Sequence, residues 1–162
     1  MQSKTIWLIV AALAAALGFY LFKRNKMIQT FQQKLMSMGQ KGGLPENLLK
    51  FIIAQSKYET SVKGIPYMSR NFIVNNNAFG YKFVKGNKWQ IQGNVSPEGD
   101  SYAKYATQED GINDIIRHYK KRLSSFVSVT TPQEFANVLK TQEYFGQTSD
   151  EYAKGVAHFY TA

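Results

Sequence analysis

The chain has 162 residues and a formal net charge of +9, a length that allows one domain and an appendage. Six Lys or Arg and no acid occur in the first 45 residues, so the excess charge lies near the N-terminus, and the lack of a concentrated basic stripe further on argues against nucleic acid as a partner. The sequence contains no cysteine, which excludes disulfides and thiolate metal sites.

Residues 6–22 are a run of seventeen uncharged residues, IWLIVAALAAALGFYLF. At about 1.5 Å per residue, a helix of this length just crosses a bilayer core of about 30 Å. Trp7 and Tyr20 lie near its ends, where aromatic rings favour the membrane interface. We therefore expect residues 1–26 to be a retained single-pass anchor. A cleaved signal peptide with a site at 14–16 is the alternative, but it would leave the apolar residues 17–22 as the mature terminus.

The remaining residues, 27–162, are expected to form one domain that begins with two helices. Ile28, Phe31, Leu35 and Met38 recur at steps of three and four, which predicts a helix over residues 27–40. A core-facing helix is preferred over a short stalk or coiled coil. Glycines at 42–43 end this helix, and a proline at 45 begins a second one over about 45–61.

A small β-hairpin is expected in the middle of the domain. Residues 63–77 are interrupted by Gly and Pro and predict irregular structure. Tyr81 and Phe83, then Trp89 and Ile91, alternate around residues 84–88, whose Gly-Asn pair is typical of a hairpin turn. Residues 93–100 form a polar loop.

Three further helices are predicted towards the C-terminus. Thr107 and Thr131 each precede a capping pattern, with a first-turn proline after Thr131, and Ser149 opens the last helix. The fold class is therefore mostly α: a helical domain with one small β-hairpin, preceded by a single N-terminal transmembrane helix.

Glu59 is the most informative residue for chemistry. It lies near the end of an apolar helix and is the only acid between residues 48 and 95. An apolar setting disfavours the charged form of a carboxyl and so raises its pKa. A carboxyl that keeps its proton is what a general acid for cleaving a glycosidic bond needs.

Four segments in order resemble a known family. AQSKYETS, NNNAFGYK, YAKYATQEDGINDIIRHY and EYFGQTSDEYAKGV, within about residues 44–160, are similar to landmarks of the bacterial and phage glucosaminidase domains. These are peptidoglycan hydrolases related in fold to lysozyme. The resemblance implies a lysozyme-like α+β fold, peptidoglycan glycan strands as substrate, and hydrolysis of β-1,4 bonds in the manner of an endo-β-N-acetylglucosaminidase. Muramidase or lytic transglycosylase activity remains an alternative, as does a non-catalytic wall-binding or structural virion protein.

The resemblance also implies residue roles. Glu59 matches the general acid, and a tyrosine of the C-terminal motif lines the cleft near it, so Tyr152 is a catalytic candidate. Substrate-binding candidates are Asn77, Phe79, Gly80, Tyr81 and Tyr144. No cofactor is expected. No metal is expected either, since the two histidines lie forty residues apart, with no paired carboxylate motif.

The chain departs from the family pattern in two respects. Ser61-Val62 replaces the usual Trp-Gly after Glu-Thr, which changes one wall of the cleft. The second carboxylate is unsettled: Glu98 is the candidate, with Asp100 beside it, and the 2-acetamido group of the substrate is the alternative to both.

The charges that flank the apolar run do not by themselves decide on which side of a membrane the domain lies. Slightly more positive charge follows the apolar run than precedes it, and the positive-inside rule would then leave the domain in the cytoplasm, away from peptidoglycan. The bias is only about one charge. We expect either a bacterial inner membrane with the domain facing the wall, or the membrane of a lipid-containing phage virion.

Overall fold

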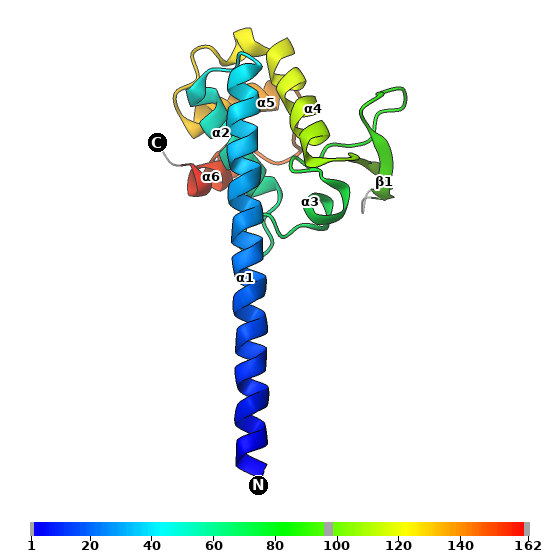
Figure 1. Ribbon diagram of the computed structural model, residues 1–162. Helices are drawn as coiled ribbons and strands as arrows, with labels where there is room; N and C mark the ends of the chain where they lie inside the picture. The colour runs from blue at the N-terminus through cyan, green and yellow to red at the C-terminus, as the bar shows by residue number, and fades with distance from the viewer. Residues whose placement is uncertain (1, 96–98, 161–162) are drawn as a thin grey trace. The chain divides into compact units, whose positions relative to one another are not determined.

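The computed structural model describes residues 2–95 and 99–160. The chain divides into two compact units, Met1–Gln33 and Lys34–Ala162. The first helix, α1 (Gln2–Lys41), begins in the first unit and ends in the second (Figure 1). The helix predicted over residues 27–40 is therefore present, but it is the continuation of α1 and not a separate element. No Gly or Pro lies between residues 19 and 38 to interrupt it.

Residues 6–22 of α1 are apolar and exposed. From Ile6 onwards α1 is long and apolar enough to cross a membrane, with a mean hydropathy of 2.0 in its most apolar stretch. Trp7 and Leu8 are each 72% exposed. An apolar surface of this kind is not stable in water without a cover.

The second unit is built mainly from helices α2 (Glu46–Glu59), α4 (Gln108–Lys121), α5 (Pro132–Thr141) and α6 (Ser149–Phe159), with a 3₁₀ helix, η1 (Leu123–Phe126). The predicted starts at Thr107 and Thr131 are confirmed, since each hydroxyl accepts from the backbone N–H three residues on in a full capping box. Thr148 caps α6 in the same way, one residue before the predicted start. These caps satisfy helix N–H groups that would otherwise lack partners.

The middle of the domain differs from the sequence prediction in two places. A short helix, α3 (Arg70–Asn75), lies in the segment expected to be irregular, and the Ser69 side chain caps it. The hairpin is shifted along the chain: it pairs β1 (Ile91–Val95) with β2 (Ser101–Lys104), antiparallel. Asn87 N–H donates to the Val84 carbonyl across the Gly-Asn turn, but this turn leads into β1 and does not join the two strands.

The register of the hairpin explains this shift. Gln92 pairs with Ala103 and Val95 with Ser101, with an irregularity between the two pairs. Gly93 lies there, and a Cβ on it would approach the Tyr102 carbonyl to 2.8 Å. A residue without a side chain is needed at such a close approach. Tyr81 and Lys82 still contact β2, because the Ala103 N–H donates to the Tyr81 carbonyl and Lys82 forms an isolated bridge with Tyr102.

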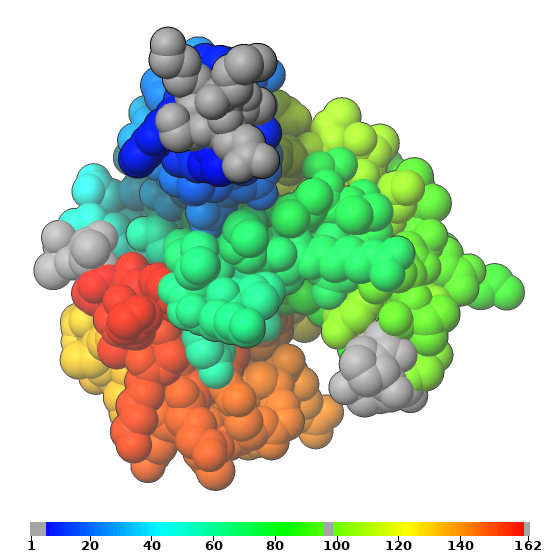
Figure 2. Space-filling model, turned by 90° about the horizontal axis from the view of Figure 1, so that it is seen from below, coloured from blue at the N-terminus to red at the C-terminus, as the bar shows by residue number. Residues whose placement is uncertain are grey.

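The elements of the second unit form two groups. α6 packs on α2 and α5, while α3 packs on β2, and Figure 1 shows α4 between these groups. The core of the helical group is aromatic, with Phe51 stacked on Phe135 at 5.2 Å. In Figure 2 a hollow separates the orange segment near residue 145 from the yellow-green hairpin.

Candidate active site

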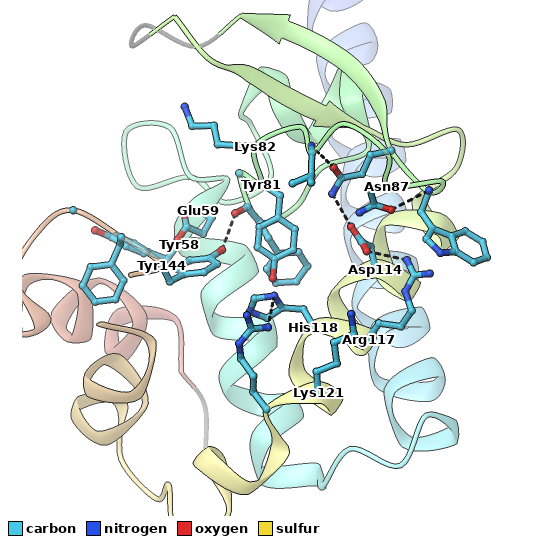
Figure 3. A pocket seen from close by; sticks show the side chains of 18 of the residues that line it. Tyr58, Glu59, Tyr81, Lys82, Asn87, Asp114, Arg117, His118, Lys121 and Tyr144 are labelled. Atoms are coloured by element: carbon cyan, nitrogen blue, oxygen red, sulfur yellow. Dashed lines mark hydrogen bonds and ion pairs between the residues drawn. The ribbon is translucent and has the colours of Figure 1, made fainter. Parts of the chain in front are cut away.

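A cleft of about 1020 Å³ runs across the second unit. Its walls come from the end of α2, the 79–90 segment, the C-terminal half of α4 and the 144–147 segment with Tyr152. Figure 3 shows Glu59, Tyr58 and Tyr144 at one end and Asn87, Asp114 and Arg117 at the other. The fold brings these segments together from four separate parts of the chain.

Glu59 is the last residue of α2 and lines the cleft. Its side chain is partly exposed at the cleft surface, although protein surrounds the carboxyl closely. Burial raises the pKa of Glu59 to about 7, and a hydrogen bond from Tyr152 opposes this rise. The raised pKa predicted from the apolar sequence context is therefore found.

A chain of buried hydrogen bonds ends on Glu59. The Tyr152 hydroxyl donates to Glu59 Oε1 at 2.5 Å. Gln55 Nε2 donates to the Tyr152 hydroxyl at 3.1 Å, and the Tyr119 hydroxyl donates to Gln55 Oε1 at 2.6 Å. Every donor in the chain points towards the carboxylate, so Oε1 is held as an acceptor.

Gln55 and Tyr119 were not among the residues predicted from the sequence. Gln55 is fully buried, and it lies four residues before Glu59, on the same face of α2. A polar residue one turn away from a candidate acid, on the buried face of an apolar helix, was the available signal. Tyr119 offered none, because it fits an ordinary apolar stripe on α4.

Gly80 faces the other carboxyl oxygen. A Cβ on Gly80 would lie 3.7 Å from Glu59 Oε2, and the backbone there has φ +63°. The backbone conformation favours glycine, since L residues rarely adopt a φ in this range, whereas the 3.7 Å approach alone would leave room for a Cβ. Oε2 therefore lies beside Gly80 and Oε1 beside the Tyr152 hydroxyl, and both of these residues line the cleft.

Four predicted aromatic residues line the cleft: Phe79, Tyr81, Tyr144 and Tyr152. Phe79 is 4% exposed, and its carbonyl accepts from the Tyr144 hydroxyl at 2.7 Å. Tyr81 and Tyr144 contact each other edge to face at 5.8 Å. Burial raises the pKa of both hydroxyls well above the ordinary tyrosine value, so both stay neutral.

Tyr152 and Asn77 are more deeply placed than a ligand-binding role alone would require. Tyr152 is 1% exposed and stacks on Phe145 at 3.9 Å. Asn77 is not among the cleft residues: its side chain is buried and bonds the Phe79 and Tyr81 N–H groups and the Tyr81 and Ala103 carbonyls. Asn77 therefore holds the 77–81 loop against β2.

The sequence offered Glu98 and Asp100 as candidates for a second carboxylate. Of these, the structure describes only Asp100, which does not line the cleft. Glu98 lies outside the described residues. Asp100 is exposed, with its carboxylate 3.7 Å from Lys82 Nζ. The second acid of the described cleft is Asp114 on α4, which the sequence analysis did not select.

Asp114 is held by three donors. It accepts from the Tyr105 hydroxyl at 2.8 Å and from Gln90 Nε2 at 2.9 Å. Arg117 donates to its second oxygen at 2.8 Å. These bonds tie the 90 and 105 segments to α4.

No group of three or more metal-ligating side chains occurs among the residues that the structure describes. His118 lines the cleft. Burial together with the charge of Arg122 lowers its pKa to about 4, and the charge of Asp114, four residues earlier on α4, only partly opposes this fall. It is therefore neutral at ordinary pH.

A helical domain with a small hairpin and a protonatable glutamate at the end of a buried helix defines a lysozyme-like glycosidase fold. The family model for Glucosaminidase, described as mannosyl-glycoprotein endo-beta-N-acetylglucosaminidase, matches residues 33–162. The chain belongs to this family, as its sequence motifs predicted.

Two solved structures share the fold. The crystal structure of a peptidoglycan hydrolase from Sphingomonas sp. A1 is 17% identical, with a TM-score of 0.56 over 79% of this chain and 86% of that chain. A mutant of a peptidoglycan hydrolase from the same organism is 19% identical, with a TM-score of 0.50 over 83% and 93%. No curated protein gave a significant match.

Proposed function

We propose that this chain is a membrane-anchored peptidoglycan hydrolase that cleaves the β-1,4 bond after N-acetylglucosamine, with Glu59 as general acid. Membership of the Glucosaminidase family supports glycosidase chemistry, and the two proteins of similar structure are peptidoglycan hydrolases. The observation that carries the proposal is the Glu59 carboxyl, which lies in a substrate-sized cleft and whose pKa of about 7 leaves much of it protonated near neutral pH.

The hydrogen bonds assign the transferable proton to one oxygen. Oε1 accepts from Tyr152, so we assign the acid proton to Oε2, which lies beside Gly80 in the cleft lining. From Oε2 the proton passes to the glycosidic oxygen as the bond from that oxygen to the anomeric carbon breaks. The bonding electron pair leaves with the oxygen, and positive charge develops on the sugar.

A nucleophile must then reach the anomeric carbon. Asp114 accepts three hydrogen bonds, and we assign it to holding the cleft wall. The carbonyl oxygen of the substrate's own 2-acetamido group is the nucleophile that we favour, followed by hydrolysis with water, as in glycosidases that do without a second carboxylate. Glu59, left as the carboxylate, takes the proton of that water.

The test of the acid role is Glu59→Gln. The amide keeps the size of the side chain but has no acid proton, so glycan release from peptidoglycan should fall by about 10² to 10⁴-fold. Mass spectrometry of the new reducing ends identifies the bond cut: N-acetylglucosamine is expected, and N-acetylmuramic acid would instead indicate a muramidase. A Glu59→Gln variant with wild-type release would refute the assignment.

The anchor is the second part of the proposal. The exposed apolar part of α1 supports a single bilayer span, and lipid would supply the cover that its side chains lack. The full chain should stay with membranes after a carbonate wash and dissolve only in detergent. Recovery in the wash supernatant, or a mature N-terminus near residue 17, would favour the signal-peptide interpretation.

A non-catalytic wall-binding protein is the competing function. One observation favours it: outside the acid itself, the described cleft holds no carboxylate free of strong hydrogen bonds. Such a protein would pellet with peptidoglycan yet release no glycan fragments, with or without the Glu59→Gln change.

A further inference from the structure

The cleft wall is strongly cationic. Five Lys or Arg side chains line it, against the two acids Glu59 and Asp114: Lys82, Lys88, Arg117, Lys121 and Arg122. Near pH 7 Glu59 is only partly ionised, so it offsets little of this charge. The excess is gathered from residues 82–122, and only Lys121 and Arg122 among the five belong to a basic run in the sequence, at 120–122.

Some of these cations already have partners. Arg117 is paired with Asp114 at 2.8 Å and lies over the Trp89 ring at 4.2 Å. Lys82 is 3.7 Å from Asp100. These two side chains therefore contribute little net charge to an incoming ligand.

Lys121 and Arg122 differ from Arg117 and Lys82, each of which has an acidic partner. Among the residues that the structure describes, no carboxylate lies within ion-pair distance of either. Arg122 Nη1 lies 3.3 Å from His118 Nδ1, and the lowered pKa of His118 leaves that ring neutral. Figure 3 shows Arg117, His118 and Lys121 all arising from α4.

The position of this pair at the end of α4 has a structural explanation that must be separated from a binding role. Cations near a helix C-terminus are favourable against its dipole. Lys120 shares that position and is exposed, but it does not line the cleft. The helix dipole explains why a cation is favourable at each of the three positions. It does not explain why Lys121 and Arg122 both line the cleft without an acidic partner among the described residues.

We propose that Lys121 and Arg122 form a subsite for the carboxylates of the peptide stems that peptidoglycan carries on alternate sugars. This inference rests on the proposed function and concerns recognition, not bond cleavage. An arginine presents paired donors that match a carboxylate, and lysine adds a second charge. A neutral polymer of N-acetylglucosamine has no such group, so the subsite distinguishes stem-bearing glycan from chitin-like glycan.

The experiment measures binding without turnover. Full chain in non-ionic detergent is pelleted with insoluble peptidoglycan as wild type, as Lys121→Gln/Arg122→Gln, and as the charge-matched control Lys104→Gln/Lys120→Gln. Lys104 and Lys120 are exposed and lie outside the cleft lining. The cleft variant should bind about threefold to tenfold more weakly at low salt, and the difference should shrink at high salt. The control should bind as the wild type does.

Binding to other ligands identifies the chemical group that is recognised. Peptidoglycan whose amines are acetylated and whose stem carboxylates are then capped as amides with carbodiimide and a small amine should bind wild type and cleft variant equally. Wild type and cleft variant should also bind N-acetylglucosamine hexamer equally. Single-stranded DNA serves as a phosphodiester polymer, and the cleft variant should not lose more affinity for it than the control does.

Three results would overturn the proposal: equal binding of cleft variant and control to native peptidoglycan, a cleft-variant defect that persists on capped peptidoglycan, or a larger defect on DNA. Glycan release is measured separately. If the wild type releases glycan but the cleft variant and the control bind native peptidoglycan equally, the subsite alone is rejected. If the wild type releases no glycan but the expected binding pattern is found, only the hydrolase proposal is rejected.

Discussion

At the scale of single residues, the chemistry depends on how Glu59 is surrounded. The titratable groups whose charge would act on it are Tyr81, Tyr119, Tyr144 and Tyr152, from the 79–90 segment, α4, the 144–147 segment and α6. Burial raises the pKa of all four well above the ordinary value, so they remain neutral while Glu59 titrates. Its pKa is therefore set by burial and by the Tyr152 hydrogen bond.

Tyr152→Phe tests that hydrogen bond. The bond favours the ionised carboxylate, so its removal should raise the pKa of Glu59 above about 7. The alkaline limb of the pH–activity profile should move to higher pH, and a ¹³C-glutamate NMR titration, assigned with Glu59→Gln, should report the same shift. Tyr144→Phe is the matched control, because its hydroxyl donates to the Phe79 carbonyl and not to Glu59. An unmoved limb in Tyr152→Phe, or an equal shift in both, would contradict the assignment.

Gln55→Met tests the next bond in the chain. The Tyr152 hydroxyl loses the donor that polarises it, so the pKa of Glu59 should rise by less than in Tyr152→Phe, in the same direction. The variant also leaves the Tyr119 hydroxyl buried without an acceptor, at a cost of about 1–3 kcal/mol in the free energy of unfolding. Denaturant unfolding measures the cost, and the NMR titration measures the shift. A purely structural role would lower stability and leave the titration unchanged.

At the scale of secondary structure, the helical cleft wall depends on a close approach between α2 and α6. A Cβ on Gly155 would overlap the Tyr58 ring. The Tyr58 hydroxyl in turn accepts from Gln147 Nε2 at 2.9 Å, and both residues line the cleft. A helix-interior glycine that is unfavourable for α6 alone is thus required by packing.

Gly155→Ala should therefore destabilise the domain although alanine is the better helix former. Overpacking costs about 1–3 kcal/mol, and the gain in helix propensity returns about 1 kcal/mol. The expected result is a Tm lower by a few degrees in thermal unfolding. Gly146→Ala, where an added Cβ meets nothing within 4 Å, should leave Tm unchanged or slightly raised. A more stable Gly155→Ala protein would show that α6 can move away from α2 freely.

At the scale of the whole molecule, the cleft carboxyl makes stability depend on pH. The pKa of Glu59 is raised in the folded protein from 4.5 to about 7, so the folded state binds the proton more tightly than the unfolded chain. Its contribution to stability is fully present below about pH 4.5 and is lost as pH rises through 7. The acids with lowered pKa, Glu109, Glu134 and Glu151, act oppositely, since their contributions are lost on acidification.

The corresponding prediction compares wild type with Glu59→Gln. The wild type should lose stability between about pH 5 and 7.5 relative to the variant, whose amide does not ionise. Thermal unfolding of both proteins across that range in the same detergent measures the difference. Parallel curves would mean that Glu59 has an ordinary pKa in the folded protein.

The sequence by itself determined the family and every described helix of eight or more residues, but not the short helix α3. The caps at Thr107 and Thr131, the apolar run at 6–22 and the placement of Glu59 on an apolar helix are local signals, and local hydrogen bonding and periodicity decide them. The hairpin was misplaced because a Gly-Asn turn is only a local preference. In the structure Tyr81 instead contacts β2 through the Ala103 N–H, 22 residues further along the chain, and Gly93 packs against Asn75, 18 residues earlier.

Only the tertiary structure decided the surroundings of the acid. The Gln55–Tyr119–Tyr152 hydrogen bonds join residues up to 97 positions apart, and no spacing in the sequence encodes such a contact. The gathering of Lys121 and Arg122 with Lys82 and Lys88 along one cleft has the same origin. Both are properties of how the elements pack, since burial and charge density depend on neighbours in space and not on neighbours in the chain.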